Sequence, residues 1–335
     1  MPLALHLGTD DLARCRFAIS PLCQTHEALR LLRRPGRHGY HRSWLHRVRR
    51  TVARLDLALL WLFIPPPGAY TPDFLGAPPE EPYPTFDGEL ARLRATDPAL
   101  AHAEMTRSLA CTPGLMESPR GRAALDDPAA TVRRLADLTE RAWQALLAPD
   151  WARHRAVLEA DIAQRSRRAA DEGLDALLTG LHPAVDWADR TLTLRRYDDL
   201  ADAQRPDGRG LLLMPSVFVW PDVVSGFARP WQPTVIYPAR GMGRLHAASA
   251  PRPPEALGRL LGGQRAALLA GLGAPASTTE LARRHGLAAS TVSVHLSVLR
   301  ETGLLVSRRQ GHYVLYTRTA LGDALVEGDV GPGAV

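Results

Sequence analysis

Hydrophobic residues recur at helical spacing through the first 180 residues, and gather in short β-prone runs bounded by proline and glycine beyond residue 190. The helical spacing predicts helices over residues 21–34, 42–64, 89–110, 128–147 and 151–178. The β-prone runs are residues 2–7, 191–197, 210–215, 217–220 and 234–237, of which those after residue 190 predict a small sheet of three or four strands. Eight prolines within residues 65–84 predict an irregular segment there.

A proline-rich run, Ala248–Pro254, separates this long region from a C-terminal stretch with its own periodicity. We therefore predict a mostly helical N-terminal domain with a few strands over residues 1–250, and a second domain over residues 254–327. The fold class expected for the whole chain is mainly α with small β-sheets.

The second domain carries the most informative pattern. A leucine-rich helix is expected from Pro254 to Gly271, and Ser277 and Glu280 then have the spacing of a capping box that opens a short helix. This helix ends at Gly286, and Ser290 is expected to cap the next one. Two short helices joined by a tight turn with a glycine are typical of a helix-turn-helix.

The last of these helices is predicted to read DNA. Val292, Leu296 and Leu299 form its core stripe, which leaves short hydroxyls, an imidazole and apolar groups on the opposite face, as suits a major groove. The residues expected to approach base edges are Ser290, Thr291, Ser293, Val294 and His295. Two β-prone runs, 304–308 and 314–318, then form a hairpin, or wing, that is expected to meet phosphate or the minor groove. The residues expected there, with the end of the helix, are Arg300, Arg308, Arg309, Gln310 and His312.

Charge supports this prediction. All 41 basic residues among the 335 are arginine, which the codon usage of a GC-rich genome explains, and the formal net charge is +6. Residues 254–318 hold eight arginines against three acids. A second cluster, Arg30–Arg54, has nine arginines and no acid. It is either a surface that faces phosphate or a solvated helix face that pairs with acids elsewhere in the chain.

Several protein classes are excluded. The longest apolar run, Leu57–Ile64, is too short to span a membrane, and no secretion signal is recognisable at the N-terminus, so we expect a cytoplasmic protein. Three cysteines without close spacing indicate neither a disulfide framework nor a structural zinc site. The phosphate-binding, zinc-protease and serine-hydrolase motifs are missing, so no enzyme and no cofactor is expected.

The residues of the second domain resemble the winged helix of ArsR-type bacterial transcription regulators. The resemblance covers about 75 residues and rests on Ser290-x-x-Ser293-x-His295-Leu296-x-x-Leu299-Arg300-x-x-Gly303-Leu304-Leu305, then Arg308-Arg309-x-Gly311 and Val314-Leu315-Tyr316. It implies a homodimer that binds a two-fold related double-stranded DNA operator, usually as a repressor released by an effector. The Cys-x-Cys pair of metal-responsive members is missing from 280–285, and 319–328 has no histidine, so no metal site is expected.

Most of residues 1–245 resembles the uncharacterised domain that precedes such winged helices in actinobacterial regulators. The resemblance rests on residues 16–22, 70–75, 210–221 and 231–241 and implies no activity. The region is predicted to sense a small-molecule effector and to dimerise, or to add DNA affinity through its arginines. Aromatic residues that either line an effector pocket or belong to the core are Phe218, Trp220, Trp231, Tyr237, Tyr70 and Phe74. The alternative function is a protein-interaction module that recruits an acidic partner without sequence-specific DNA binding.

Overall fold

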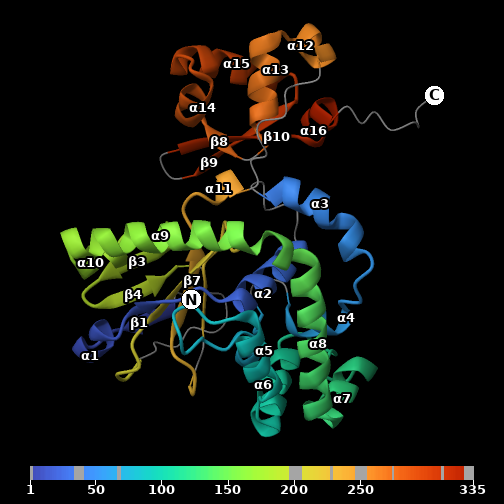
Figure 1. Ribbon diagram of the computed structural model, residues 1–335, viewed down its shortest axis with the longest axis vertical. Coiled ribbons are helices and arrows are strands. Elements are labelled where there is room, and N and C mark those ends of the chain that lie inside the picture. Colours follow the sequence, from blue (N-terminus) through green and yellow to red (C-terminus); the bar gives the residue numbers. More distant parts are fainter. Residues whose placement is uncertain are drawn as a thin grey trace. The chain divides into compact units, whose positions relative to one another are not determined.

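The computed structural model describes residues 3–33, 41–65, 69–195, 206–226, 229–245, 255–273, 275–310 and 313–327. The proline-rich run at 248–254 and His312 lie outside the described residues. The chain forms two compact units, one of residues 1–37 with 48–241, the other of residues 38–47 with 242–335. Helices predominate in both, with small sheets, so the predicted fold class is confirmed (Figure 1).

The helices up to residue 178 are more numerous and shorter than predicted. They are α1 (Thr9–Ala13), α2 (Pro21–Leu32), α3 (Arg42–Val52), α4 (Ala58–Phe63), α5 (Phe86–Arg94), α6 (Pro98–Ala110), α7 (Pro119–Asp126), α8 (Pro128–Leu146), α9 (Trp151–Glu172) and α10 (Leu174–Leu178). Two short 3-10 helices, η3 (Asp73–Gly76) and η4 (Ala148–Asp150), interrupt the connections. None of the helices in the described ranges is long and apolar enough to cross a membrane.

Three of the predicted helices are each broken in two. The stretch 42–64 divides into α3 and α4, with turns between them. The stretch 89–110 divides because Asp97 caps α6 by accepting from the amides of Ala99 and Leu100, and Pro98 occupies the first position. The stretch 151–178 divides at Gly173, whose φ of 88° belongs to the left-handed region.

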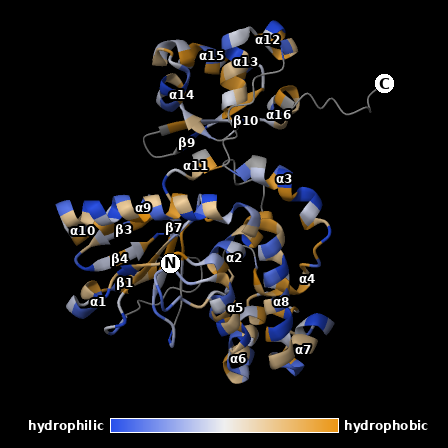
Figure 2. Cartoon of the chain, in the orientation of Figure 1, coloured by the Kyte–Doolittle hydropathy of each residue, from blue (hydrophilic) through white to orange (hydrophobic). Residues whose placement is uncertain are grey.

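Two sheets form in the first unit, where one of three or four strands was predicted. The first is antiparallel and has the order β1-β4-β3, with β1 (Leu3–His6), β3 (Val185–Ala188) and β4 (Thr191–Leu194). The second has the order β2-β5-β7-β6, with β2 (Arg16–Phe17), β5 (Leu212–Ser216), β6 (Val224–Gly226) and β7 (Thr234–Pro238). Its β2, β5 and β7 are parallel and β6 is antiparallel. The apolar strand β7 is orange in Figure 2.

The run 217–220 is not a strand, although its residues are β-prone. The chain leaves β5 at Ser216, whose hydroxyl donates to the Gln24 side chain at 3.1 Å. The same Gln24 oxygen accepts from the Val217 amide at 3.1 Å, and the Gln24 amide donates to the Pro215 carbonyl at 3.0 Å. This buried glutamine of α2 therefore takes up the backbone groups that a longer strand would have paired.

The second unit contains a helix-turn-helix followed by a β-hairpin, which is the arrangement of a winged helix. Its elements are α11 (Met242–Leu245), α12 (Glu255–Leu261), α13 (Gly263–Gly271), β8 (Ala276–Ser277), α14 (Thr278–His285), α15 (Ala289–Glu301), β9 (Leu305–Gln310), β10 (Tyr313–Arg318) and α16 (Ala320–Glu327). The three strands form one sheet of order β8-β10-β9. The single helix predicted for 254–271 is broken at Gly262, where φ is 82°. Leucines from α13, α14 and α15 fill the core of the helical part.

Candidate DNA-binding site

Helix α14 begins and ends where the sequence predicts. The Ser277 hydroxyl accepts from the Glu280 amide at 3.2 Å, and Gly286 ends the helix in the left-handed conformation with φ 66°. The Glu280 carboxylate pairs with Arg284 at 2.9 Å. A second guanidinium nitrogen of Arg284 donates to the Gly271 carbonyl at 2.8 Å, which ties α14 to the end of α13.

Helix α15 begins earlier than predicted. Ala288 is its N-cap and makes no side-chain hydrogen bond, so Ser290 is not the capping residue. The amide of Val292 donates to the Ala288 carbonyl at 3.1 Å, which places Ser290 inside the first turn. The helix starts directly after the left-handed turn at Gly286, and this leaves the Ser290 hydroxyl exposed on the helix surface.

The two faces of α15 differ as expected. Val292, Leu296 and Leu299 are almost completely buried in the domain core. Val294 on the opposite face is 63% exposed, a large value for an apolar side chain in a folded domain. The exposed polar residues of the same helix are Ser290, Thr291, Ser293, Arg300 and, at its end, Glu301.

His295 lies at the border between these faces. Its ring is half-buried, and its Nε2 lies 2.9 Å from the amide oxygen of Gln264 on α13. The contact directs the imidazole toward the start of α13. Gln264 itself is exposed, and sequence periodicity gave no signal for this contact, since the two residues belong to different helices.

The wing is an antiparallel ribbon in which Arg308 pairs with Leu315, and Arg309 pairs with Val314. Both arginines are exposed, and as consecutive strand residues they point to opposite faces of the ribbon. The strands extend to Gln310 and Tyr313, further than predicted. The side chain of Gln310 and all of His312 lie outside what the structure describes.

The base of the wing is anchored to α16. The buried guanidinium of Arg318 pairs with Asp323 at 2.9 Å, and the Thr319 hydroxyl donates to the Gly303 carbonyl at 2.7 Å. Gly322 sits so close to the Leu304 carbonyl that an added Cβ would lie 2.3 Å from that oxygen. The ribbon is therefore held at the end that contains Arg318, and Arg308 and Arg309 lie toward the other end.

Exposed charge around α15 and the wing is mainly positive. Arg283, Arg300, Arg308 and Arg309 are exposed, and Glu301 is the acid of α15. Burial, with a smaller effect from Arg284, lowers the pKa of His285 below its ordinary value, so this residue adds no charge at neutral pH. A surface of short hydroxyls and one valine flanked by guanidinium groups fits base edges flanked by phosphate.

Two parts of the chain match known families. Residues 98–243 match a family of unknown function (DUF5937), and residues 248–308 match a helix-turn-helix domain. No curated protein and no solved structure matches the chain. The second match and the geometry of α14, α15 and the hairpin define the class of protein, a DNA-binding transcription regulator. More particularly, the helix-turn-helix of this protein follows a domain whose family has no known function.

The aromatic residues predicted for an effector pocket are distributed over two places in the first unit. Tyr70, Phe74 and Trp231 come together around Glu104, whose carboxylate accepts from the Phe74 amide at 2.8 Å and from the Trp231 indole at 2.9 Å. The Arg107 guanidinium lies 4.1 Å from the centroid of the Tyr70 ring. Tyr70 and Phe74 are buried, whereas Trp231 is half-exposed.

The other three aromatics lie elsewhere. Tyr237 is fully buried, and its hydroxyl donates to Asp161 at 2.9 Å, while Asp161 also pairs with Arg165 at 2.9 Å. Phe218 is buried, and Trp220 is half-exposed. The effector-pocket assignment stays a prediction. Glu104 and Asp161, which bind the Trp231 indole and the Tyr237 hydroxyl, were not singled out from the sequence.

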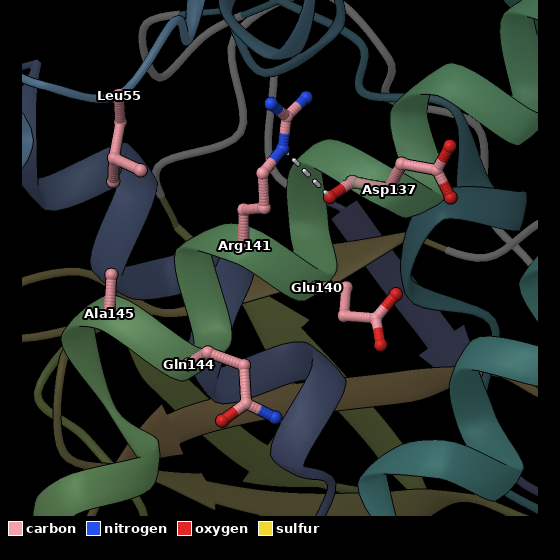
Figure 3. Close-up of a pocket in the computed structure, with 6 residues that line it drawn as sticks. All are labelled: Leu55, Asp137, Glu140, Arg141, Gln144 and Ala145. Atoms are coloured by element: carbon pink, nitrogen blue, oxygen red, sulfur yellow. Dashed lines mark hydrogen bonds between the residues drawn. The ribbon is translucent and has the colours of Figure 1, made fainter.

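A groove does open on the first unit, along the exposed side of α8. It has a volume of about 610 Å³ and is lined by Leu55, Asp137, Glu140, Arg141, Gln144 and Ala145 (Figure 3). Its two carboxylates are already paired with Arg94, at 2.9 Å and 2.7 Å. Over the described ranges, histidine, cysteine and acidic residues form no group of three that could hold a metal ion.

Proposed function

We propose that the protein is a dimeric repressor of the ArsR family that acts in the cytoplasm, and that an effector at the N-terminal domain tunes its binding to a double-stranded DNA operator. In this proposal residues 1–250 are the regulatory or dimerisation domain and residues 254–327 bind DNA. The residues that approach base edges are Ser290, Thr291, Ser293, Val294 and His295. The residues that meet phosphate or the minor groove are Arg300, Arg308, Arg309, Gln310 and His312.

The observation that carries the proposal is the exposed face of α15. Val294 is 63% exposed between hydroxyl-bearing residues, and no described residue of the second unit packs over it. An apolar side chain in this position suits the methyl group of thymine, and serine and threonine hydroxyls can donate to or accept from any base.

Dimerisation draws support from two leucines on the helices that flank the helix-turn-helix. Leu260 of α12 is 70% exposed and Leu321 of α16 is 56% exposed. Both helices pack on α13. A second copy of the domain would remove them from water, and a two-fold dimer would present two copies of α15 to related half-sites.

An electrophoretic mobility shift tests operator binding. The probe is the DNA directly upstream of the protein's own coding region, and unlabelled duplex of scrambled sequence is the competitor. We expect a shifted band that survives the scrambled competitor and is lost in V294E, since a carboxylate there would face the base edges. If wild type and V294E shift every duplex equally, sequence-specific binding is ruled out, and an interaction module becomes the better description.

The effector is sought by thermal unfolding of the full chain with metal salts and small metabolites. A ligand that binds only the folded state raises the midpoint by mass action, whatever its site. A stabilising compound must also change operator affinity for the regulatory proposal to hold. A compound that stabilises the protein without changing its DNA binding would contradict the regulatory proposal.

A further inference from the structure

Helix α3 has one buried face and one strongly basic face. Trp44 and Val48 are buried, at successive turns of the helix. The opposite side carries His46, Arg49, Arg50 and, in the turn that follows the helix, Arg54, all of them exposed. We call these four residues the α3 basic face. The packing of the apolar side fixes the direction of the charged side, so these groups are held together on the surface.

The α3 basic face lacks the acids that accompany the exposed arginines of α9. On α9, Arg155 pairs with Glu159 and Arg168 with Glu172, each one turn away. The sequence has no Asp or Glu from residue 28 through residue 55, so α3 offers no such partner. Within the part of the chain that the structure describes, Arg49, Arg50 and Arg54 make no ion pair with acids from other elements either.

This arrangement is unfavourable for α3 alone. Arg49 and Arg50 lie in its last turn, where the negative end of the helix dipole offsets part of their repulsion. Arg54 lies beyond the helix and one turn from Arg50, so three guanidinium groups still face water side by side. A polyanion would replace their condensed counterions and relieve the repulsion.

The first part of α3 also belongs to the DNA-binding unit. Residues 38–47 group with residues 242–335 as one compact body, although about 200 residues separate them in sequence. Arg49 and Arg50 continue the same uninterrupted helix. His46 of the α3 basic face thus belongs to the unit that carries the helix-turn-helix, and Arg49, Arg50 and Arg54 belong to the first unit.

We propose that the α3 basic face is a second DNA-binding element, which contacts the phosphate backbone without reading sequence. The inference rests on the proposed function, since it assigns the same class of partner to another surface. The ligand is the phosphodiester backbone of double-stranded DNA. Planar guanidinium groups bind phosphate oxygens in pairs, and consecutive phosphates provide the repeated charge that a row of arginines requires.

An acidic protein partner fits less well. Protein interfaces have an apolar centre with aromatic residues and a charged rim. Beside the α3 basic face only the small side chain of Ala53 is exposed between Arg50 and Arg54, and the apolar residues Trp44 and Val48 are buried on the other side of the helix. The face therefore provides charge without the apolar area on which a specific protein contact depends.

The test measures binding of the full-length protein to a fluorescein-labelled 30-base-pair duplex of random sequence at several salt concentrations between about 50 and 200 mM. The variant is R49Q/R50Q/R54Q. We expect the slope of log affinity against log salt to become shallower by about 2 to 3, from ~0.9 for each lost phosphate contact. Far-UV circular dichroism and the thermal midpoint must match wild type.

The matched control is R120Q/R133Q/R134Q, which removes three other exposed arginines of the first unit and changes net charge equally. It should keep the wild-type slope. An equal fall in both triple variants would show a net-charge effect only and overturn the proposal. An unchanged slope in R49Q/R50Q/R54Q would also overturn it. If that variant also loses binding to polyglutamate, the α3 basic face binds an acidic protein and not DNA.

A wing variant separates this inference from the proposed function. R308Q/R309Q should also lower the salt slope, and its effect should add to that of R49Q/R50Q/R54Q when the two sets are combined, because they remove different phosphate contacts. If the wing variant lowers the slope and the α3 variant does not, the regulator stands and the α3 basic face is not a DNA contact. If neither variant has an effect, DNA binding itself fails.

Discussion

His295 on α15 lies 2.9 Å from Gln264 on α13, ring nitrogen Nε2 to amide oxygen. With the proton on Nε2, the imidazole donates to that oxygen. The pair couples the orientation of a proposed base-reading side chain to a residue at the start of the preceding helix. We therefore predict that Gln264 is a positioning residue for DNA recognition.

We predict that Q264A relaxes sequence preference and leaves non-specific affinity unchanged. Freed from its partner, His295 samples more rotamers, so the ratio of operator to random-sequence affinity should fall about threefold to tenfold, the loss of one hydrogen bond. Competition gel shifts measure this ratio. In a double-mutant cycle, H295A should produce the same loss, and Q264A/H295A should lose no more than either alone. Full additivity would show that the contact does not matter for recognition.

The two wing arginines should contribute separately. Arg308 and Arg309 point to opposite faces of the ribbon, so their side chains cannot share one phosphate. Each arginine is therefore expected to contact one phosphate at most. We expect each single alanine variant to reduce the salt slope by up to about 1 and the double variant by up to about 2, equally for all sequences. Fluorescence anisotropy over a salt series measures these slopes. Unchanged affinity and slope in the double variant would remove the wing from the interface.

Gly322→Ala should loosen the C-terminal helix. The new Cβ would lie 2.3 Å from the Leu304 carbonyl oxygen, which is backbone and cannot turn aside. We expect a loss of about 1 to 3 kcal/mol in the free energy of unfolding, as for other overpacked sites. Gly258→Ala is the control, since its Cβ would meet open space on α12 and alanine favours a helix. Urea unfolding followed by circular dichroism compares the two, and equal midpoints would contradict the packing of α16.

Glu89 should make stability depend on pH. It is buried, and its carboxylate accepts from the Leu22 amide at 2.9 Å. Burial raises its pKa from 4.5 to about 7, so the folded protein keeps a proton that the unfolded chain releases between these values. The stabilisation from this group is complete below pH 4.5 and is lost as the pH rises to about 7.

Glu89→Gln replaces the carboxyl group with a neutral one of the same shape. We expect the variant to unfold like wild type near pH 4.5 and to be more stable by up to about 3 kcal/mol near pH 8. Urea midpoints at several pH values measure the difference. His26 should have the opposite effect on stability. Burial lowers its pKa from 6.5 to about 3, so its contribution to stability is lost as the pH falls between these values. A constant difference between Glu89→Gln and wild type across this range would show that Glu89 is ionised in the folded protein.

The sequence predicted the helix-turn-helix well because its signals are local. Ser277 and Gly286 mark the two ends of α14, and the leucines of α15 repeat at helical spacing. The helix breaks at Pro98, Gly173 and Gly262 also had local signals, which the long hydrophobic periodicity outweighed. The contact between His295 and Gln264 had none, because it depends on how two helices pack.

The first unit was harder to predict for the same reason. Strand β2 has two residues and pairs with β5, which follows almost 200 residues later. Gln24, Glu104 and Asp161 are buried polar side chains that hold loops from distant parts of the chain. Neither a strand of this length nor a buried carboxylate can be recognised from the spacing of hydrophobic residues.

The pairing of β1 with β4, residues 3–6 with residues 191–194, also has a consequence for biosynthesis. Ribosomes add about 5 to 20 residues per second, so the first strand waits roughly 10 to 40 seconds for its partner to be made. During this time its apolar side chains and unpaired backbone are accessible to chaperones. Truncations that end before residue 194 lack part or all of β4, so their β1 should remain unpaired even where their helices form.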